Sequence, residues 1–250
     1  MTEKKDESPI KTELLVHDLK VPISVIDAGA KSLLNRQDVY GELTPKQEKV
    51  IRRIIRNTLS TQRLVNDILE LGRSREGVMI CVNFSVGDLV TSVLIEIFDL
   101  FDPPAAEAIR DAGSFREFVR VLGEKGTRLD FDKETWQTVV CLDQAKVKQI
   151  LRNLLTNAYK HRSSFVEISG KVENTGLVLV VRDDGRGIPK ADHQKIFKTY
   201  FTQGGPMDST IKSHGLGLAG VMVLLRDMGG ELELVSEGGD GARFIASIPI

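Results

Sequence analysis

Two helical stripes of apolar residues, separated by a short polar break, occupy the first third of the chain. The first lies between Lys11 and Gln37 and the second between Ile51 and Ile68, with apolar residues recurring at helical intervals. The sequence Thr44-Pro45-Lys46-Gln47 between them is a typical helix start, because it offers a hydroxyl N-cap, a proline at the first helical position and a glutamine for a capping box. We therefore expect a charged tail over residues 1–9 and two long helices over residues 10–76, packed as an antiparallel hairpin.

The hairpin alone would leave the outer half of each stripe in water. Each large apolar side chain left exposed forgoes about 1.5 to 3 kcal/mol. Pairing two hairpins into a four-helix bundle removes this cost, so the pattern predicts a homodimer. The first stripe consists of Leu15, Leu19, Ile26, Ala30 and Leu33.

Beyond Gly77 the pattern changes to short β-type runs mixed with helical stretches. Helices are predicted from Gln144 to His161 and from Leu218 to Met228, and residues 101–126 look like an insertion with a short helix of its own. Such a mixture favours an α+β sandwich, so we expect a second domain over residues 77–250. The β-type runs are Val78 to Phe84, Arg128 to Phe131, Thr135 to Leu142, Phe165 to Val172, Leu177 to Arg182, Glu231 to Val235 and Ala242 to Ile248.

The composition excludes several classes of function. With 34 basic and 35 acidic side chains the formal net charge is -1, which removes any whole-chain argument for binding nucleic acid. No apolar stretch approaches the roughly 20 residues that span a bilayer, and the charged start lacks the pattern of a secretory signal. Cys81 and Cys141 lie far apart without a CxxC motif, so we expect two ordinary thiols in a reducing, cytoplasmic environment.

His17 is the first residue that could carry chemistry. It lies two positions from both Leu15 and Leu19, about 200° around a helix from each, and should therefore point into water. A neutral imidazole can attack an electrophile through one nitrogen while a carboxylate holds the proton on the other, and Asp18 is the neighbouring carboxylate. Taken alone, a surface histidine beside a surface aspartate is the simpler interpretation.

Polar residues of the helix predicted at Gln144–His161 share one face. Asn153, Asn157, Lys160 and His161 follow the spacing i, i+4, i+7 and i+8. Amide oxygens suit Mg²⁺, which takes few protein ligands and prefers phosphate and water oxygens for the rest, and a lysine one turn further on could meet phosphate. The alternative is an ordinary solvated helix face. The apolar residues that should form the buried face are Leu151, Leu154, Leu155 and Ala158.

Asp183 begins an acidic, glycine-rich turn that follows the apolar run Leu177 to Val181 and contains Asp184, Gly185 and Gly187. Most turns of this kind are plain β-turns. Such a turn can also let a flat base approach the backbone while Asp183 accepts a hydrogen bond from an exocyclic amine.

The sequence Gly215-Leu216-Gly217-Leu218-Ala219-Gly220 opens the last predicted helix and matches the dinucleotide fingerprint GxGxxG. A dinucleotide-binding oxidoreductase is disfavoured, because Thr202 to His214 is polar and turn-rich where a buried strand is needed, and too little chain follows for the remaining βαβ units. A glycine-rich helix N-terminus still offers free backbone N–H groups to phosphates.

Taken in this order, the four features resemble the catalytic core of a bacterial sensor histidine kinase, whose H, N, G1, F and G2 boxes they match from about Glu13 to Ile250. The resemblance implies a dimeric four-helix bundle followed by the α/β sandwich ATP-binding domain that DNA gyrase and a heat-shock chaperone share. It also implies that the protein uses ATP and Mg²⁺ to autophosphorylate His17, with Asp18 as acidic helper, and passes the phosphoryl group to an aspartate on the receiver domain of a response regulator.

The same resemblance assigns roles within the nucleotide site. Asn157 would bind Mg²⁺, Asp183 would recognise adenine, and Lys195 to Phe201 would be the F box. The ATP-binding residues implied are Asn153, Asn157, Lys160, His161, Asp183, Gly185, Gly187, Tyr200, Gly215, Leu216 and Gly217.

Four positions distinguish this chain within that family or its superfamily. ATP-hydrolysing relatives carry a water-activating glutamate where this chain has Asn153, which favours transfer to a histidine over hydrolysis by a gyrase-like clamp. Phosphatase-competent members have threonine or asparagine at the place of Val21, so phosphatase activity is not expected. Thr202 replaces the basic lid residue of many members, and Ala242 replaces a threonine that is often found near the adenine. These two replacements leave a nucleotide-binding pseudokinase or dimeric scaffold as the alternative to a kinase.

Overall fold

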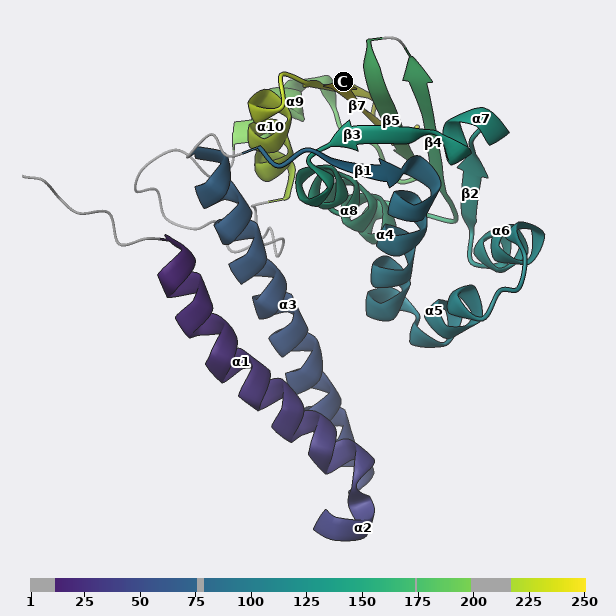
Figure 1. The fold of residues 1–250 in the computed structure, drawn as a ribbon. Coiled ribbons are helices and arrows are strands. Elements are labelled where there is room, and N and C mark those ends of the chain that lie inside the picture. The colour runs from purple at the N-terminus through teal and green to yellow at the C-terminus, as the bar shows by residue number, and fades with distance from the viewer. Residues whose placement is uncertain (1–11, 76–78, 174, 199–216) are drawn as a thin grey trace, which may run out of the picture. The chain divides into compact units, whose positions relative to one another are not determined.

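The computed structural model of the protein describes residues 12–75, 79–173, 175–198 and 217–250 (Figure 1). The chain divides into two compact units, residues 1–76 and residues 77–250. The described part of the first unit is helical, and the second unit combines helices with two sheets. Among the described helices, none is both long and apolar enough to cross a membrane.

The first unit is a helical hairpin. Its two long helices are α1 (Thr12–Asn35) and α3 (Pro45–Arg75), with the short helix α2 (Gln37–Tyr40) in the predicted polar break. The predicted capping box is present, because Thr44 Oγ1 accepts a hydrogen bond from the backbone N–H of Gln47 (3.3 Å) and Gln47 Oε1 accepts one from the N–H of Thr44 (2.8 Å). The local sequence therefore sets the start of α3.

Part of the predicted stripe of α1 is exposed, as expected for a hairpin without a second hairpin beside it. Ile23 and Ala30 are buried, whereas Leu19, Ile26 and Leu33 of the stripe are exposed. The apolar surface of α1 is wider than the face that one neighbouring helix can cover, so these side chains remain in water in the single chain.

The second unit is an α+β sandwich. Its elements in chain order are β1 (Val82–Ser85), α4 (Val86–Phe101), α5 (Pro103–Arg110), α6 (Phe115–Glu124), β2 (Thr127–Asp130), α7 (Lys133–Gln137), β3 (Val139–Leu142), α8 (Gln144–His161), β4 (Val166–Glu173), β5 (Gly176–Asp183), a 3₁₀ turn (Lys190–Asp192), α9 (His193–Lys198), α10 (Gly217–Asp227), β6 (Glu231–Ser236) and β7 (Ala242–Pro249). Five of the described strands form a sheet in the order β2-β4-β5-β7-β6, in which only β2 and β4 are parallel neighbours. Strands β1 and β3 form a separate antiparallel pair.

The core of the sandwich lies between the five-stranded sheet and the helices α4, α8 and α10 (Figure 1). Val181 and Phe244 from the sheet, and Leu154 and Leu224 from α8 and α10, are 1% exposed or less. Burying each such side chain contributes about 1.5 to 3 kcal/mol. This packing fixes α8 and α10 on the sheet, and these two helices carry five of the predicted site residues: Asn153, Asn157, Lys160, His161 and Gly217.

Two segments of the second unit differ from the prediction. Residues 135–142, expected as one strand, form the end of α7 followed by β3, because Asp132 caps α7 by accepting the backbone N–H of Thr135 (2.6 Å). The segment 101–126 contains two helices, α5 and α6, instead of one, and Ser114 begins the second by accepting a backbone N–H. In both places a capping side chain outweighs the apolar pattern.

The two cysteines are not free thiols in the structure. The sulfur atoms of Cys81 and Cys141 are bonded, and their Cα atoms lie 5.5 Å apart. Strand β1 pairs with β3 so that Asn83 stands opposite Cys141, which brings Cys81 close from the diagonal position. The expectation of two separate thiols was wrong, because distance along the chain does not indicate which residues face each other across two strands.

Lys146 of α8 is a buried cation. Its side chain is 1% exposed, and its ammonium group pairs with the carboxylate of Asp227 at the end of α10. Loss of one partner leaves the other charge without this counter-ion where solvent is scarce.

We therefore expect Asp227→Asn to lower the free energy of unfolding by about 3 kcal/mol, measured by urea denaturation. Arg120→Gln, which breaks an exposed ion pair with Glu124 on α6, should leave that free energy unchanged; similar losses in both variants would contradict the expectation.

Candidate functional site

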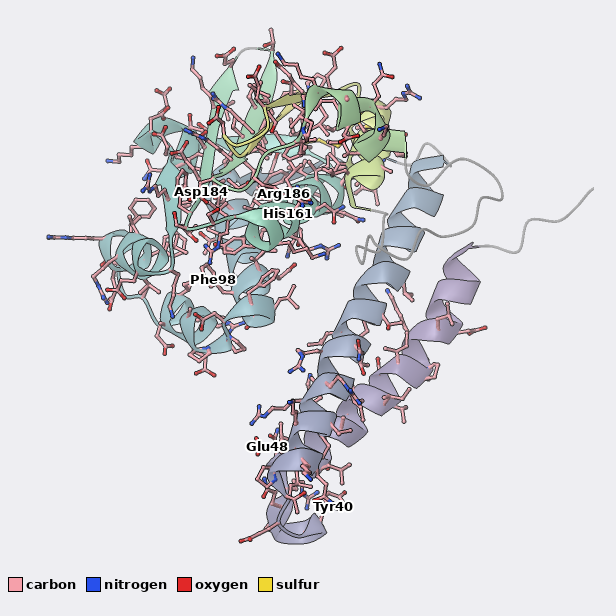
Figure 2. The ribbon with its side chains drawn as sticks, turned by 180° about the vertical axis from the view of Figure 1, so that it is seen from behind. Tyr40, Glu48, Phe98, His161, Asp184 and Arg186 are labelled. Atoms are coloured by element: carbon pink, nitrogen blue, oxygen red, sulfur yellow. A yellow bond between two sulfur atoms is a disulfide. The ribbon has the colours of Figure 1, made fainter. Side chains whose placement is uncertain are left out.

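The turn after β5 lies against the end of α8. A Cβ atom on Gly185 would stand 2.2 Å from the carbonyl oxygen of His161, so only glycine lets the two segments come this close. Gly187 has a φ of +67°, and a Cβ there would stand 2.0 Å from the carbonyl oxygen of Glu237. Figure 2 shows Asp184 and His161 in the same region of the second unit. The fold thus brings together two motifs that are separate in the sequence.

Asp183 is a buried carboxylate at the end of β5. The residue is 2% exposed, and its Oδ1 accepts a hydrogen bond from the backbone N–H of Gly185 (2.9 Å). Burial raises the pKa of this carboxyl above its usual range, and the hydrogen bond from Gly185 and the nearby His161 offset the rise only in part. A carboxylate has about four acceptor positions, so Asp183 can also accept from an amine of a bound base.

Helix α8 presents the predicted polar face. Asn153 and Asn157 are half-buried, while Lys160 and His161 are exposed. Within the described residues, no other group hydrogen-bonds to the side-chain amide of Asn157, so its oxygen is available as a ligand. The four apolar residues expected on the opposite face are all buried, which confirms that part of the prediction: Leu151, Leu154, Leu155 and Ala158.

The ring of His161 stands in a mixed electrostatic environment. Partial burial lowers its pKa from the ordinary value, the guanidinium of Arg186 lowers it further, and the carboxylate of Asp183 acts in the opposite direction. The net shift is downward, so the imidazole is mainly neutral at pH 7. A neutral ring can donate one hydrogen bond to a phosphate oxygen without carrying a charge.

Asn153 joins α8 to the first residue of α10. Its Nδ2 donates to the carbonyl oxygen of Gly217 (3.4 Å), and a Cβ on Gly220 would stand 4.0 Å from the same nitrogen. The start of α10 therefore lies beside the polar face of α8. Free backbone N–H groups at a helix N-terminus attract anions, so this place suits a phosphate group.

Three predicted nucleotide-site residues, Tyr200, Gly215 and Leu216, lie outside the described residues, and so does Thr202. Ala242 is described and stands opposite Asp183 in the β5–β7 pairing. The described part of the predicted site therefore comprises the polar face of α8, the turn after β5 and the start of α10.

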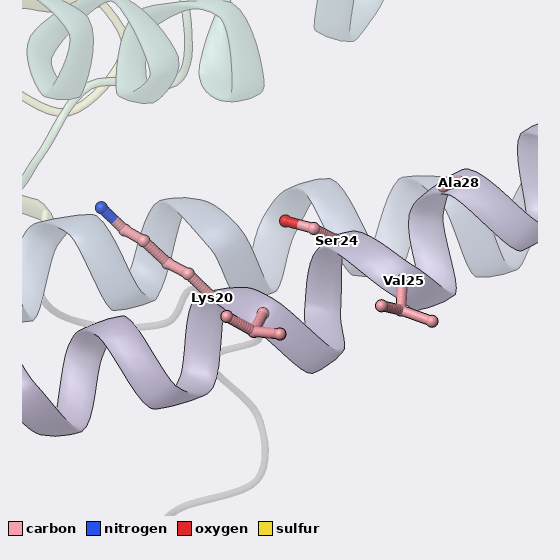
Figure 3. Close-up of a pocket in the computed structure, with 5 residues that line it drawn as sticks. Lys20, Ser24, Val25 and Ala28 are labelled. Carbon is pink, nitrogen blue, oxygen red and sulfur yellow. The ribbon is translucent and has the colours of Figure 1, made fainter.

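The predicted phosphoacceptor residues belong to the first unit. His17 and Asp18 lie in α1; Asp18 is exposed, and the side chain of His17 lies outside the described residues. A shallow hollow follows on the surface of α1, and Figure 3 shows residues that line it. Its lining residues are Lys20, Val21, Ser24, Val25 and Ala28.

Asp184 has no role in the sequence-based prediction, yet its carboxylate is the most heavily hydrogen-bonded in this turn. It accepts hydrogen bonds from the backbone N–H groups of Ser163, Ser164 and Phe165, each at 3.0 Å, and from the Ser164 hydroxyl. The donors lie 19 to 21 residues earlier in the chain, in the loop after α8, so no local motif could have indicated them.

Two domain families match the chain. Residues 13–77 match the His Kinase A (phospho-acceptor) domain. Residues 142–250 match the family of histidine kinase-, DNA gyrase B- and HSP90-like ATPases. The residues described above on α8, after β5 and at the start of α10 all fall within the second match.

Curated relatives are similar over most of this chain. The sensor histidine kinase YkoH of Bacillus subtilis is 28% identical over 226 residues, which cover 90% of this chain and 44% of that protein. The sensor protein KdpD of Clostridium acetobutylicum is 24% identical over 235 residues, covering 93% of this chain and 24% of that protein. The chain thus spans less than half the length of these relatives.

Solved structures share the fold. ShkA, solved at full length in complex with AMPPNP, aligns with a TM-score of 0.64 at 22% identity, covering 96% of this chain and 46% of that one. The histidine kinase AdeS of Acinetobacter baumannii aligns with a TM-score of 0.52 at 19% identity, covering 93% of this chain and 97% of that one. With a phospho-acceptor domain followed by an ATPase domain on this fold, the protein belongs to the histidine kinase family and carries its catalytic core.

Proposed function

We propose that the protein is an ATP-dependent histidine kinase of a two-component system, which phosphorylates His17 and passes the phosphoryl group to an aspartate of a response regulator. The observation that carries this proposal is the contact of Asn153 with Gly217, which places the amide face of α8 beside a helix N-terminus. An ATP-binding domain built in this way, in one chain with a phospho-acceptor domain, fits phosphoryl transfer to protein.

The nucleotide would be held at both of its ends. Asp183 accepts a hydrogen bond from the exocyclic amine of adenine, and Gly185 lets the flat base approach the backbone. Lys160 donates to the phosphates, and the backbone N–H groups at the start of α10 add further donors beside Gly217. Tyr200, Gly215 and Leu216 complete the proposed set.

We also propose that ATP binds with Mg²⁺. The amide oxygen of Asn157, which accepts no hydrogen bond from the described residues, fits this ion, because Mg²⁺ favours hard oxygen donors and takes few of them from protein. Mg²⁺ would neutralise charge that develops on the phosphates during transfer. Asn157 would fix the position of the β- and γ-phosphates relative to Lys160.

The transfer step needs only a nucleophile and a leaving group. One imidazole nitrogen of His17 forms a bond to the γ-phosphorus, the bond from that phosphorus to the bridging oxygen breaks, and the electron pair leaves with ADP. Asp18 holds the proton on the other ring nitrogen. Asn153 cannot take a proton from water, so the site lacks at that position the base that would favour hydrolysis.

The partners follow from the surface of the first unit. Exposed apolar side chains on α1, such as Leu19 and Ile26, would be buried in a dimeric four-helix bundle. A receiver domain must reach His17, so we assign to it the adjoining hollow that begins at Lys20. We place the reaction in the cytoplasm.

The chemical stability of the labelled protein tests the proposal. After incubation with γ-labelled ATP and Mg²⁺, the label should be lost in acid and survive alkali, as expected for a phosphorus–nitrogen bond. Label that survives acid and is lost in alkali would indicate a hydroxyl acceptor, and label lost in both would indicate a carboxyl acceptor; either result would contradict the proposal. Mg²⁺-dependent binding of ATP without any labelling would indicate a pseudokinase.

A further inference from the structure

Asp184 lies between the two halves of the proposed nucleotide site. It follows Asp183, which we assign to the adenine. Its carboxylate holds residues 163–165, which come shortly after Lys160 and His161 at the phosphate end of α8. One side chain therefore connects the part of the site that would hold the base with the part that would hold the phosphates.

The carboxylate of Asp184 is engaged by the protein itself. Three backbone N–H groups at 3.0 Å and the Ser164 hydroxyl occupy about the four acceptor positions that a carboxylate has. Burial raises the pKa of this carboxyl, but the hydrogen bonds from Ser164, Phe165 and Ser163 outweigh burial and bring the pKa well below its usual range. Asp184 thus stays ionised at neutral pH and keeps no acceptor position for a ligand.

A second anchor holds the end of α8 independently of Asp184. Arg162 Nη1 donates to the backbone carbonyl oxygen of Lys125 (2.9 Å), and its guanidinium carbon lies 4.4 Å from the centre of the Tyr159 ring. Removal of the Asp184 carboxylate would therefore release one side of the loop and leave the other in place. The domain should still fold, and the change should be in the spacing between the loop and the turn after β5.

We propose that Asp184 is a positioning residue that sets the distance between the adenine carboxylate Asp183 and the phosphate-binding groups Lys160 and His161. A ligand that reaches both ends gains affinity only if the two subsites stand at the spacing of its own groups. Asp184 would maintain this spacing without touching the nucleotide. The inference rests on the proposed function, because it takes ATP as the ligand.

Three ligands separate positioning from a general structural role. We would measure the dissociation constants of MgATP, adenosine and inorganic tripolyphosphate with the full chain and with Asp184→Ala, following chemical shifts for the weak ligands. The affinity for MgATP should fall at least about tenfold, as for loss of a charged hydrogen-bond network. The affinities for adenosine and tripolyphosphate should each change less than about threefold, because each occupies only one end.

Conservative and matched variants complete the test. Asp184→Asn keeps one acceptor oxygen, so its affinity for MgATP should lie between those of the wild type and Asp184→Ala. Ser164→Ala keeps the three backbone hydrogen bonds, so its affinity for MgATP should be close to that of the wild type. Asp130→Asn removes one exposed negative charge at the end of β2 and should leave the affinities for all three ligands unchanged. If Asp184→Ala does not fold, the three-ligand comparison is made with Asp184→Asn.

The outcomes are distinct. Equal losses of affinity for all three ligands would show a general loosening of the domain. A loss of affinity for tripolyphosphate alone would place Asp184 at the phosphates, and an unchanged affinity for MgATP would show that Asp184 has no role in binding. Each of these results overturns the inference. Failure of the wild-type protein to bind MgATP would overturn the proposed function instead.

Discussion

The His17→Gln variant is expected to bind MgATP like the wild type and to incorporate no phosphoryl group. Glutamine has no nitrogen lone pair that can attack phosphorus, so removing the imidazole removes the nucleophile while the nucleotide site in the second unit keeps all its residues. We expect labelling to fall by roughly a thousandfold or more. Labelling is measured with γ-labelled ATP, and binding is measured by calorimetry on the same preparation.

A second substitution at this place should have a smaller effect. Asp18→Asn leaves the nucleophile and removes the carboxylate that holds its proton, so the rate should fall by about a hundredfold. Lys31→Gln, an exposed substitution on the same helix, should label at the wild-type rate. Full labelling of His17→Gln would show that another residue accepts the phosphoryl group.

The Asp183→Asn variant should lose ATP binding without losing stability. Its amide keeps one oxygen for the N–H of Gly185 but turns an NH₂ group or a neutral oxygen toward the adenine amine. Loss of a charged hydrogen bond in a buried place corresponds to a fall in affinity of about 10- to 100-fold. Calorimetry with an ATP analogue measures this fall, and Asp130→Asn serves as the control for loss of one negative charge.

The stability of the same variant should depend on pH in a defined direction. The pKa of Asp183 is raised by burial, so the folded state binds the proton more tightly than the unfolded state. Ionisation of this carboxyl therefore lowers the free energy of unfolding when the pH is above the pKa of Asp183 in the folded state. This loss disappears as the pH falls toward the pKa of Asp183 in the unfolded state. Without ATP, Asp183→Asn should melt at or above the wild-type temperature at pH 7 to 8, and its advantage should shrink on acidification. A variant that melts lower at pH 8 would contradict the assignment.

Regular periodicity and local capping signals made much of the fold readable from the sequence. Helix α8 was predicted with its observed bounds, since its apolar face is continuous over Leu151 to Ala158. The start of α3 was predicted because both partners of its capping box lie within four residues. Strand β5 was found from an apolar run that ends at an acidic turn.

Features that depend on contacts distant in the sequence were missed. The bond between Cys81 and Cys141 requires knowing that β1 pairs with β3. The stripe predicted that part of α1 would be exposed in the hairpin alone, but not that Leu19 would be among the exposed residues, which depends on the part of the stripe that the second helix covers. For the site, residue types and order indicated Asp183 and Asn157, whereas the role of Asp184 depends on a loop 19 to 21 residues away. Periodicity cannot report such pairings.

Helix α10 is held at two points along its length. Lys146 pairs with Asp227 at its end, and Asn153 contacts Gly217 at its beginning, about 15 Å away along the axis. Because both ends of α10 contact α8, the helix should neither rotate nor slide, and it should keep its position during the catalytic cycle. Any opening and closing that admits ATP and releases ADP must then come from chain segments other than this helix, and its amide hydrogens beyond the first turn should exchange slowly both with and without nucleotide.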